Sequence, residues 1–340
     1  MANQKIRIGF VPLNDCAPIV LAHELGVFQK YDLQVELSRE PGWATIRDKM
    51  VYGQLEAAHA LAGMVFAATL GLGSIAQPCL TALVLNLNGN AITVSSRLWE
   101  LGSRVSFHTA LKNQCNGEER PTFGMVSPVS SHHFILRKWF EQHSISAEHD
   151  VRVVVVPPPQ MVANLQAGHL AGFCVGEPWN SVAVLSKIGV CAATSTAIFP
   201  DHIEKVLMVS QSFAERHHEQ HIKLIMALME TCAFCQNPSN RAQVAGTLSQ
   251  KRYLNVSIQA VRYGLDGKLG RETHPPFLTF SGLSANEPGF DKAEWVLRQL
   301  MKCGVLSDPA LVRKLSIAKC FRPDLYHEAV RLGSPGNSST

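Results

Sequence analysis

Short runs of aliphatic and β-branched residues alternate with helical patterns as far as Ser210, and this alternation constrains the fold more than any other feature. The apolar runs predict strands at residues 7–11, 33–37, 81–87, 92–95, 151–156, 172–175 and 206–209. Helical periodicity predicts helices at 18–28, 44–52, 131–143, 160–167 and 179–186, and then at 221–235, 238–248, 292–303 and 308–317. Such alternation is typical of an α/β fold with parallel sheets covered by helices on both faces.

The order of these elements predicts two α/β lobes that the chain crosses twice, outward near 90–95 and back near 205–210. We expect residues 1–92 and 206–332 to form lobe I, residues 93–205 to form lobe II, and residues 333–340 to form a flexible tail. Ligands of open α/β sheets bind beyond the carboxyl ends of the strands, so the predicted ligand cleft lies between the lobes.

Charge and hydropathy exclude two classes of partner. The 31 Lys and Arg against 27 Asp and Glu give a net charge of +4, and the basic residues are spread along the chain, which disfavours direct nucleic-acid binding. Residues 57–96 contain no charged side chain, but the most apolar part, 60–76, is interrupted by glycines. It is also shorter than the roughly 20 residues of a membrane span. We therefore expect a helix buried in an α/β lobe and no membrane insertion.

The cysteines and the N-terminus favour a cytoplasmic location. Nine scattered cysteines would risk mispairing in an oxidising compartment. The chain runs directly from its first residues into the predicted strand at 7–11, without a basic and apolar leader. A periplasmic location would be expected instead if a signal peptide had been removed.

Three loops in which Gly, Pro or Ser lead into a helix could bind an anion, at residues 41–45, 127–132 and 157–160. A helix N-terminus presents unpaired N–H groups and the positive end of the helix dipole, so three of them facing one cleft would form an anion site. Each loop taken alone is an ordinary helix start. Trp43 and His132 lie in the first turns of two of these helices, whereas Lys205 on its own is interpreted as a solvated surface lysine.

Other reactive side chains are interpreted as structural. Cys232 and Cys235 are predicted to pack in the core, because no second pair with zinc-like spacing exists. His217, His218 and His221 are interpreted as the exposed start of a helix. No nucleophile, base and orienting group occur together, so we expect no catalytic residues, no cofactor, no metal and no enzymatic activity.

Five ordered motifs resemble those of the nitrate/bicarbonate-type solute-binding proteins of ABC transporters. They are GWATIRDK at 42–49, EAAHAL at 56–61, NLNGNAI at 86–92, PPPQMVAN at 157–164 and VGEPWN at 175–180. The resemblance extends from about residue 6 to residue 322. It implies a two-lobed, type II periplasmic-binding-protein-like fold with a small planar anion bound between the lobes.

The resemblance also implies which residues hold the anion. Trp43 matches the family's tryptophan, His132 matches its histidine, and Asn90 stands where the family usually has glutamine. The asparagine keeps the amide but is one methylene shorter, so the cleft must close further or a water must bridge. The motifs also bring two further residues near the cleft, Gln160 and Glu177, the latter as a structural hydrogen-bond acceptor.

The position of Lys205 distinguishes the ligands of this family. Nitrate binders resemble this chain in the sequence Glu204-Lys205-Val206, whereas bicarbonate binders have a carboxylate at the lysine position that helps hold calcium. An ammonium group pairs directly with a monoanion, while a carboxylate would repel it. The resemblance therefore favours nitrate or nitrite.

Two roles follow from this resemblance, with two alternatives. Without a leader, the chain is similar to the cytosolic nitrate/nitrite sensors that control an RNA-binding antitermination regulator. If it is exported, it would be the solute-binding component that delivers nitrate to the membrane subunits of an ABC transporter. A bicarbonate- or sulfonate-binding receptor is the alternative ligand class. An enzyme similar to the thiamine-pyrimidine synthase is the remote one, because Cys232 and Cys235 do not match its cysteine cluster.

Overall fold

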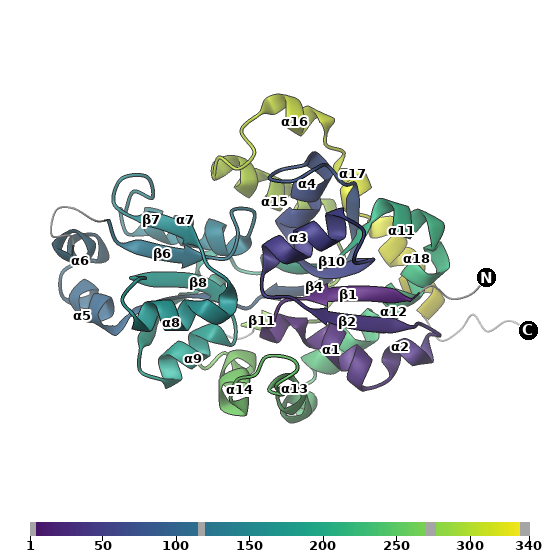
Figure 1. Ribbon diagram of the computed structural model, residues 1–340, viewed down its shortest axis with the longest axis horizontal. Helices are drawn as coiled ribbons and strands as arrows, with labels where there is room; N and C mark the ends of the chain where they lie inside the picture. The colour runs from purple at the N-terminus through teal and green to yellow at the C-terminus, as the bar shows by residue number, and fades with distance from the viewer. Residues whose placement is uncertain (1–4, 115–119, 270–276, 334–340) are drawn as a thin grey trace, which may run out of the picture.

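The computed structural model describes residues 5–114, 120–269 and 277–333, and within them the chain forms two β-sheets flanked by helices (Figure 1). The first sheet has six strands in the order β11-β4-β10-β3-β1-β2. Their bounds are β1 Ile6–Phe10, β2 Val35–Arg39, β3 Ala57–Leu61, β4 Cys79–Asn88, β10 Ile203–Ser210 and β11 Leu278–Thr279. The second sheet has five strands in the order β7-β6-β8-β5-β9. These are β5 Asn90–Ser95, β6 Thr122–Met125, β7 Arg152–Val155, β8 Gly172–Gly176 and β9 Gly189–Thr194.

Helices cover both faces of the first sheet (Figure 1). One face packs against α1 and α12, and the other against α3, α4 and α15. The helices of this part of the chain are α1 Ala17–Glu24, α2 Val27–Lys30, α3 Trp43–Val51, α4 Ala62–Leu70, α11 Gln211–Arg216, α12 His218–Gln236, α13 Arg241–Leu248, α14 Ile258–Asp266, α15 Phe290–Lys302, α16 Pro309–Lys314, α17 Ile317–Cys320 and α18 Pro323–Gly333.

The second sheet has its own core and its own helices. These helices are α5 Ser96–Arg104, α6 Phe107–Gln114, α7 Ser131–Gln142, α8 Met161–Gln166, α9 Trp179–Leu185 and α10 Ser195–Ile198. Three short 3-10 helices, η1 Asn14–Cys16, η2 Pro158–Gln160 and η3 Pro238–Asn240, complete the structure. Helix α14 packs against α9 and so joins the two parts of the molecule.

The chain passes from one sheet to the other at two places. Asn88 and Gly89 connect β4 to β5 with φ angles of 61° and 93°. Gly89 is required there for two reasons: its φ angle is positive, and a Cβ would stand 2.6 Å from Leu278 Cδ1. The return runs from α10 into β10. The predicted lobe boundaries at 92/93 and 205/206 fall inside β5 and β10 and stay predictions.

Both sheets are mixed, so the prediction of parallel sheets is wrong in part. Strands β1, β2 and β3 are parallel, as are β6, β7 and β8. The two strands that follow the crossings run against their neighbours, β5 against β8 and β9, and β10 against β3 and β4. Each of these strands starts beside the last residues of a neighbouring strand, β5 beside the end of β8 and β10 beside the end of β3, and therefore runs antiparallel to it.

The secondary structure of the uncharged segment, residues 57–96, was also only partly predicted. The expected helix at 60–76 consists of the end of β3 and the shorter helix α4, and the predicted helix at 308–317 divides into α16 and α17. The sequence of β3, Ala-Ala-His-Ala-Leu, has little strand propensity, and pairing with β1 and β10 holds it extended. Strands β6, β9 and β11 were not predicted at all. Among the described residues, none of the helices has both the length and the apolar character needed to cross a membrane. Gly333 ends α18, and the remainder of the predicted tail lies outside the described residues.

Candidate functional site

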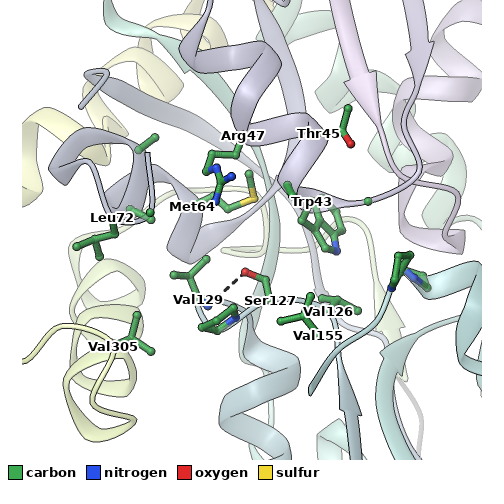
Figure 2. A pocket seen from close by; sticks show the side chains of 18 of the residues that line it. Trp43, Thr45, Arg47, Met64, Leu72, Val126, Ser127, Val129, Val155 and Val305 are labelled. Carbon is green, nitrogen blue, oxygen red and sulfur yellow. Dashed lines mark hydrogen bonds between the residues drawn. The ribbon is translucent and has the colours of Figure 1, made fainter. Parts of the chain in front are cut away.

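A cavity of about 450 Å³ is lined by residues of both lobes. All three loops that the sequence singled out contribute to it, through residues 41–45, 127–129 and 157–158. Figure 2 shows Trp43 and Met64 of the first lobe opposite Val126 and Ser127 of the second. The walls are mostly apolar, and Arg47 is the charged residue of the lining.

The start of helix α3 lines this cavity and has no side-chain cap. Its N-cap residue, Gly42, has no side chain to accept from the first N–H groups, which lack acceptors within a helix. The Trp43 side chain is only 3% exposed, and among the described residues its indole Nε1 has no hydrogen-bond partner. In contrast, Ser130 caps α7 by accepting from the His133 N–H at 3.2 Å.

Trp43 also contacts a buried polar cluster that does not line the cavity. Its ring lies 5.6 Å from that of His59, and Lys205 Nζ stands 5.3 Å from the indole centroid, within reach of a cation–π interaction. The cluster is assembled from η1, β3, β5, α7 and β10. Its members are Asp15, His59, Asn90, Ser131, His132, Glu204 and Lys205, each less than 9% exposed.

Lys205 is enclosed by two carboxylates. Its Nζ lies 2.9 Å from Asp15 Oδ2 and contacts Glu204 Oε1, and the residue is fully buried. Asp15 Oδ1 is in turn 2.9 Å from His59 Nε2. The interpretation of Lys205 as a solvated surface lysine is therefore wrong.

The Glu204 carboxylate is the shared acceptor of the cluster. Its Oε2 accepts from Asn90 Nδ2 at 2.7 Å and from the Ser131 hydroxyl, while Oε1 lies 3.2 Å from His132 Nε2 and contacts Lys205. The same His132 nitrogen is 2.7 Å from Asn90 Oδ1. Four side chains from three elements thus converge on a single planar anion.

A distortion of β10 makes this convergence possible. Successive side chains of a regular strand point to opposite faces, yet Glu204 and Lys205 touch each other. The register between β10 and β4 shifts on both sides of Lys205. Such irregularities redirect side chains at functional sites.

The surroundings of these groups define their charges. Burial alone would raise the pKa of Asp15 and of Glu204, but Lys205 and the neighbouring histidines outweigh it, so both pKa values fall below the ordinary range. Burial would lower the pKa of Lys205, but the two carboxylates raise it above its usual value. Burial lowers the pKa of His59 and of His132. At neutral pH the cluster therefore holds two carboxylates, one ammonium and neutral imidazoles.

The structure brings together four of the six predicted site residues: Trp43, Asn90, His132 and Lys205. Gln160 does not join them, because it is exposed at the end of η2. Glu177 is buried elsewhere, where its Oε2 accepts from the Ser181 N–H at 3.1 Å, and burial raises its pKa to about 7. The roles of all six in binding stay predictions.

Sequence reasoning missed Asp15, His59, Ser131 and Glu204 as members of the cluster. Glu204 and Ser131 lie next to predicted residues, so their neighbourhood could have suggested them. Nothing in the local pattern around Asp15 or His59 indicates that they meet Lys205, since only the packing of η1 and β3 beside β10 brings them there.

Of the other reactive side chains, Cys232, Cys235 and His221 are buried, whereas His218 is exposed, as predicted for a helix start. Cys232 and Cys235 are buried free thiols, as predicted for core residues. His221 is fully buried, so its interpretation as part of an exposed helix start is wrong; it lies on the face of α12 that packs inward, beside Phe213. Within the described ranges, no group of three or more His, Cys, Asp or Glu side chains is arranged to hold a metal ion.

Comparison with known proteins assigns the family. A model described as the NMT1-like family matches residues 2–249. The chain belongs to the NMT1-like family. As its motifs predicted, this NMT1-like protein is of the nitrate/bicarbonate solute-binding type, because relatives named NrtA match along nearly all of its length.

Individual relatives of the NMT1-like protein carry nitrate or bicarbonate in their names. It is 37% identical over 339 residues to the nitrate import ATP-binding protein NrtC of Synechocystis sp., covering 97% of this chain and 50% of NrtC. It is 36% identical over 311 residues to the bicarbonate transport ATP-binding protein CmpC of the same organism, covering 89% of this chain and 46% of CmpC. The chain thus spans about half the length of these two relatives.

Solved structures confirm the two-lobed fold of this NMT1-like protein. The crystal structure of the periplasmic nitrate-binding protein NrtA from Synechocystis PCC 6803 matches with a TM-score of 0.89 and 25% identity, over 97% of this chain and 89% of that one. A desulfurization enzyme, DSZB, matches with a TM-score of 0.61 and 12% identity, a likeness that shows the fold alone. Apart from DSZB, the similar proteins named above carry binding or transport in their names.

Proposed function

We propose that this protein is a receptor for a small inorganic oxyanion, nitrate or nitrite, which binds between the lobes at the buried cluster. One observation carries the proposal: Asn90, Ser131 and Lys205 direct their donors to a single planar acceptor, the Glu204 carboxylate, and His132 Nε2 lies 3.2 Å from the same group. A carboxylate and a nitrate ion share a planar centre and a delocalised negative charge, so donors that satisfy one suit the other.

The cavity supports this assignment. It adjoins the cluster at Trp43, whose indole Nε1 is a free donor, and the uncapped start of α3 adds backbone N–H groups. Donors with no partner in a buried position favour an acceptor from outside the protein. Lys205 in place of a carboxylate favours a monoanion over a calcium-dependent bicarbonate site.

We further propose that the protein acts as a cytosolic sensor, in which the anion favours a closed form that differs in its grip on an RNA-binding antitermination regulator. The eight cysteines that the structure describes are all free, which suits a reducing compartment. A solute-binding component that serves ABC transporter membrane subunits is the second role, and the names of the relatives favour it.

Thermal unfolding tests the ligand class. The protein is heated with nitrate, nitrite, bicarbonate with and without calcium, and methanesulfonate, at matched ionic strength. An anion at 100 times its dissociation constant stabilises the folded state by about 2.7 kcal/mol. A shift with nitrate or nitrite alone supports the proposal, whereas a shift that requires bicarbonate and calcium, or only a sulfonate, contradicts it.

A further inference from the structure

The anion donors of the buried cluster already have an acceptor that belongs to the protein. Glu204 accepts from Asn90 Nδ2 at 2.7 Å and from Ser131, and lies 3.2 Å from His132 Nε2 and in contact with Lys205. Its side chain is fully enclosed. An incoming oxyanion that uses these donors has to take them from Glu204.

The charges of the cluster make a second anion unfavourable by itself. Asp15 and Glu204 carry negative charges, Lys205 carries a positive one, and burial keeps His59 and His132 neutral, so negative charge is already in excess. Like charges in a water-excluded site repel strongly, and protonation of one of them relieves the repulsion.

Two other titratable groups face Glu204, the His202 imidazole and the Cys174 thiol. His202 Nε2 is 3.4 Å from Glu204 Oε2, and the other nitrogen of its ring pairs with the Phe199 carbonyl at 2.9 Å. Burial and the neighbouring Glu204 raise the pKa of the Cys174 thiol well above its ordinary value, so this group on β8 is neutral.

We infer that Glu204 is an internal occupant of the oxyanion site, and that an external anion displaces it from its donors together with the uptake of one proton. Glu204 is thereby a specificity-determining residue: it excludes anions that cannot replace a planar carboxylate on Asn90, Ser131, His132 and Lys205. The proton is held most simply by Glu204 itself, because the bound anion removes the donors that stabilise its charged form. The inference rests on the proposed anion-binding function.

The first test uses the unmodified protein. Nitrate and nitrite affinities are measured by calorimetry from pH 5.5 to 8.5, in two buffers of different ionisation enthalpy, which gives the number of protons taken up. We expect one proton per anion and a Kd that rises about tenfold per pH unit. Binding with a constant Kd and no proton uptake would overturn the inference and leave the proposed function standing.

The second test compares two isosteric variants, in each of which one of the two carboxylates beside Lys205 is replaced by an uncharged amide. Glu204→Gln frees the donors from a charged competitor, so its Kd at pH 8 is expected to be at least tenfold lower than that of the unmodified protein and to vary little with pH. Asp15→Asn leaves Glu204 on its donors, so the pH dependence is expected to remain. Circular dichroism and thermal unfolding establish that both variants are folded.

The outcomes of the variants separate the two proposals. Weaker binding by Glu204→Gln with an unchanged pH dependence, or equal loss of pH dependence in both variants, would overturn the role of Glu204. Binding by Glu204→Gln without detectable binding by the unmodified protein would overturn the displacement, since the external anion then never replaces the internal carboxylate. Failure of both proteins to bind either anion at pH 6 would overturn the inference and the proposed function together.

Discussion

Replacement of Lys205 by methionine measures how strongly the buried cluster depends on its single ammonium group. Lys205 is fully buried, its Nζ is 2.9 Å from Asp15 Oδ2, and it also contacts Glu204. Removal of one partner from a buried ion pair costs about 3–5 kcal/mol, because the remaining charge is left uncompensated. Two carboxylates lose the same cation here, so we expect a loss of about 5 kcal/mol at pH 8, at the upper end of that range.

The dependence of this loss on pH follows from the pKa values. With Lys205 in place, the pKa values of Asp15 and Glu204 lie below their ordinary range. Without it, burial raises them, so the folded variant binds protons more readily than its unfolded chain. The variant therefore recovers stability as the pH falls, and its deficit relative to the unmodified protein should be smaller at pH 5 than at pH 8.

Urea unfolding at both pH values provides the measurement. A matched control is Lys30→Met, which breaks a largely exposed pair with Glu230 at 2.7 Å and should cost much less than Lys205→Met, because solvent screens this pair. The double variant Lys205→Met/Asp15→Asn should lose less than the single one, because one of the stranded charges is gone. A deficit for Lys205→Met under about 1 kcal/mol, or one that is equal at pH 5 and pH 8, would refute the reasoning.

Lys205→Glu, which places a third carboxylate in the cluster, is expected to prevent folding and is not a usable test of binding.

Three further substitutions test the site and the core. Trp43→Phe keeps the aromatic ring but removes the unpartnered Nε1–H, so nitrate should bind about tenfold or more weakly with little change in stability; unchanged affinity would exclude the indole from the site. In Gly63→Ala the new Cβ would stand 2.2 Å from the Val129 carbonyl oxygen across the cleft, so the lobes should close less readily. The affinity for nitrate should therefore fall about tenfold, while the free energy of unfolding stays within about 1 kcal/mol of that of the unmodified protein. Burial lowers the pKa of His221 from 6.5 to about 3, so the unfolded chain takes up its proton first as the pH falls. Between pH 8 and pH 5 the unmodified protein should lose about 2 kcal/mol that His221→Leu does not lose, as urea unfolding of both would reveal; equal losses would contradict the pKa shift.

The binding candidates were predictable where the sequence carries local motifs. Trp43, Asn90, His132 and Lys205 stand in short segments whose residues resemble those of one family, and the structure brings all four together. Gln160 also stands in such a segment, yet it is exposed. A motif records which residues are close in sequence to a site, and it does not say which way each side chain points.

The sequence by itself determined the alternation of strands and helices, the positions of most helices and the family. These depend on local periodicity and on turn residues, which act within a few positions along the chain. Only the tertiary structure decided that β3 is a strand, that Lys205 is buried, and that Asp15 and Glu204 share its ammonium group. The physical reason is that these features arise from contacts between segments far apart in the sequence, and from a register shift in β10 that no local pattern encodes.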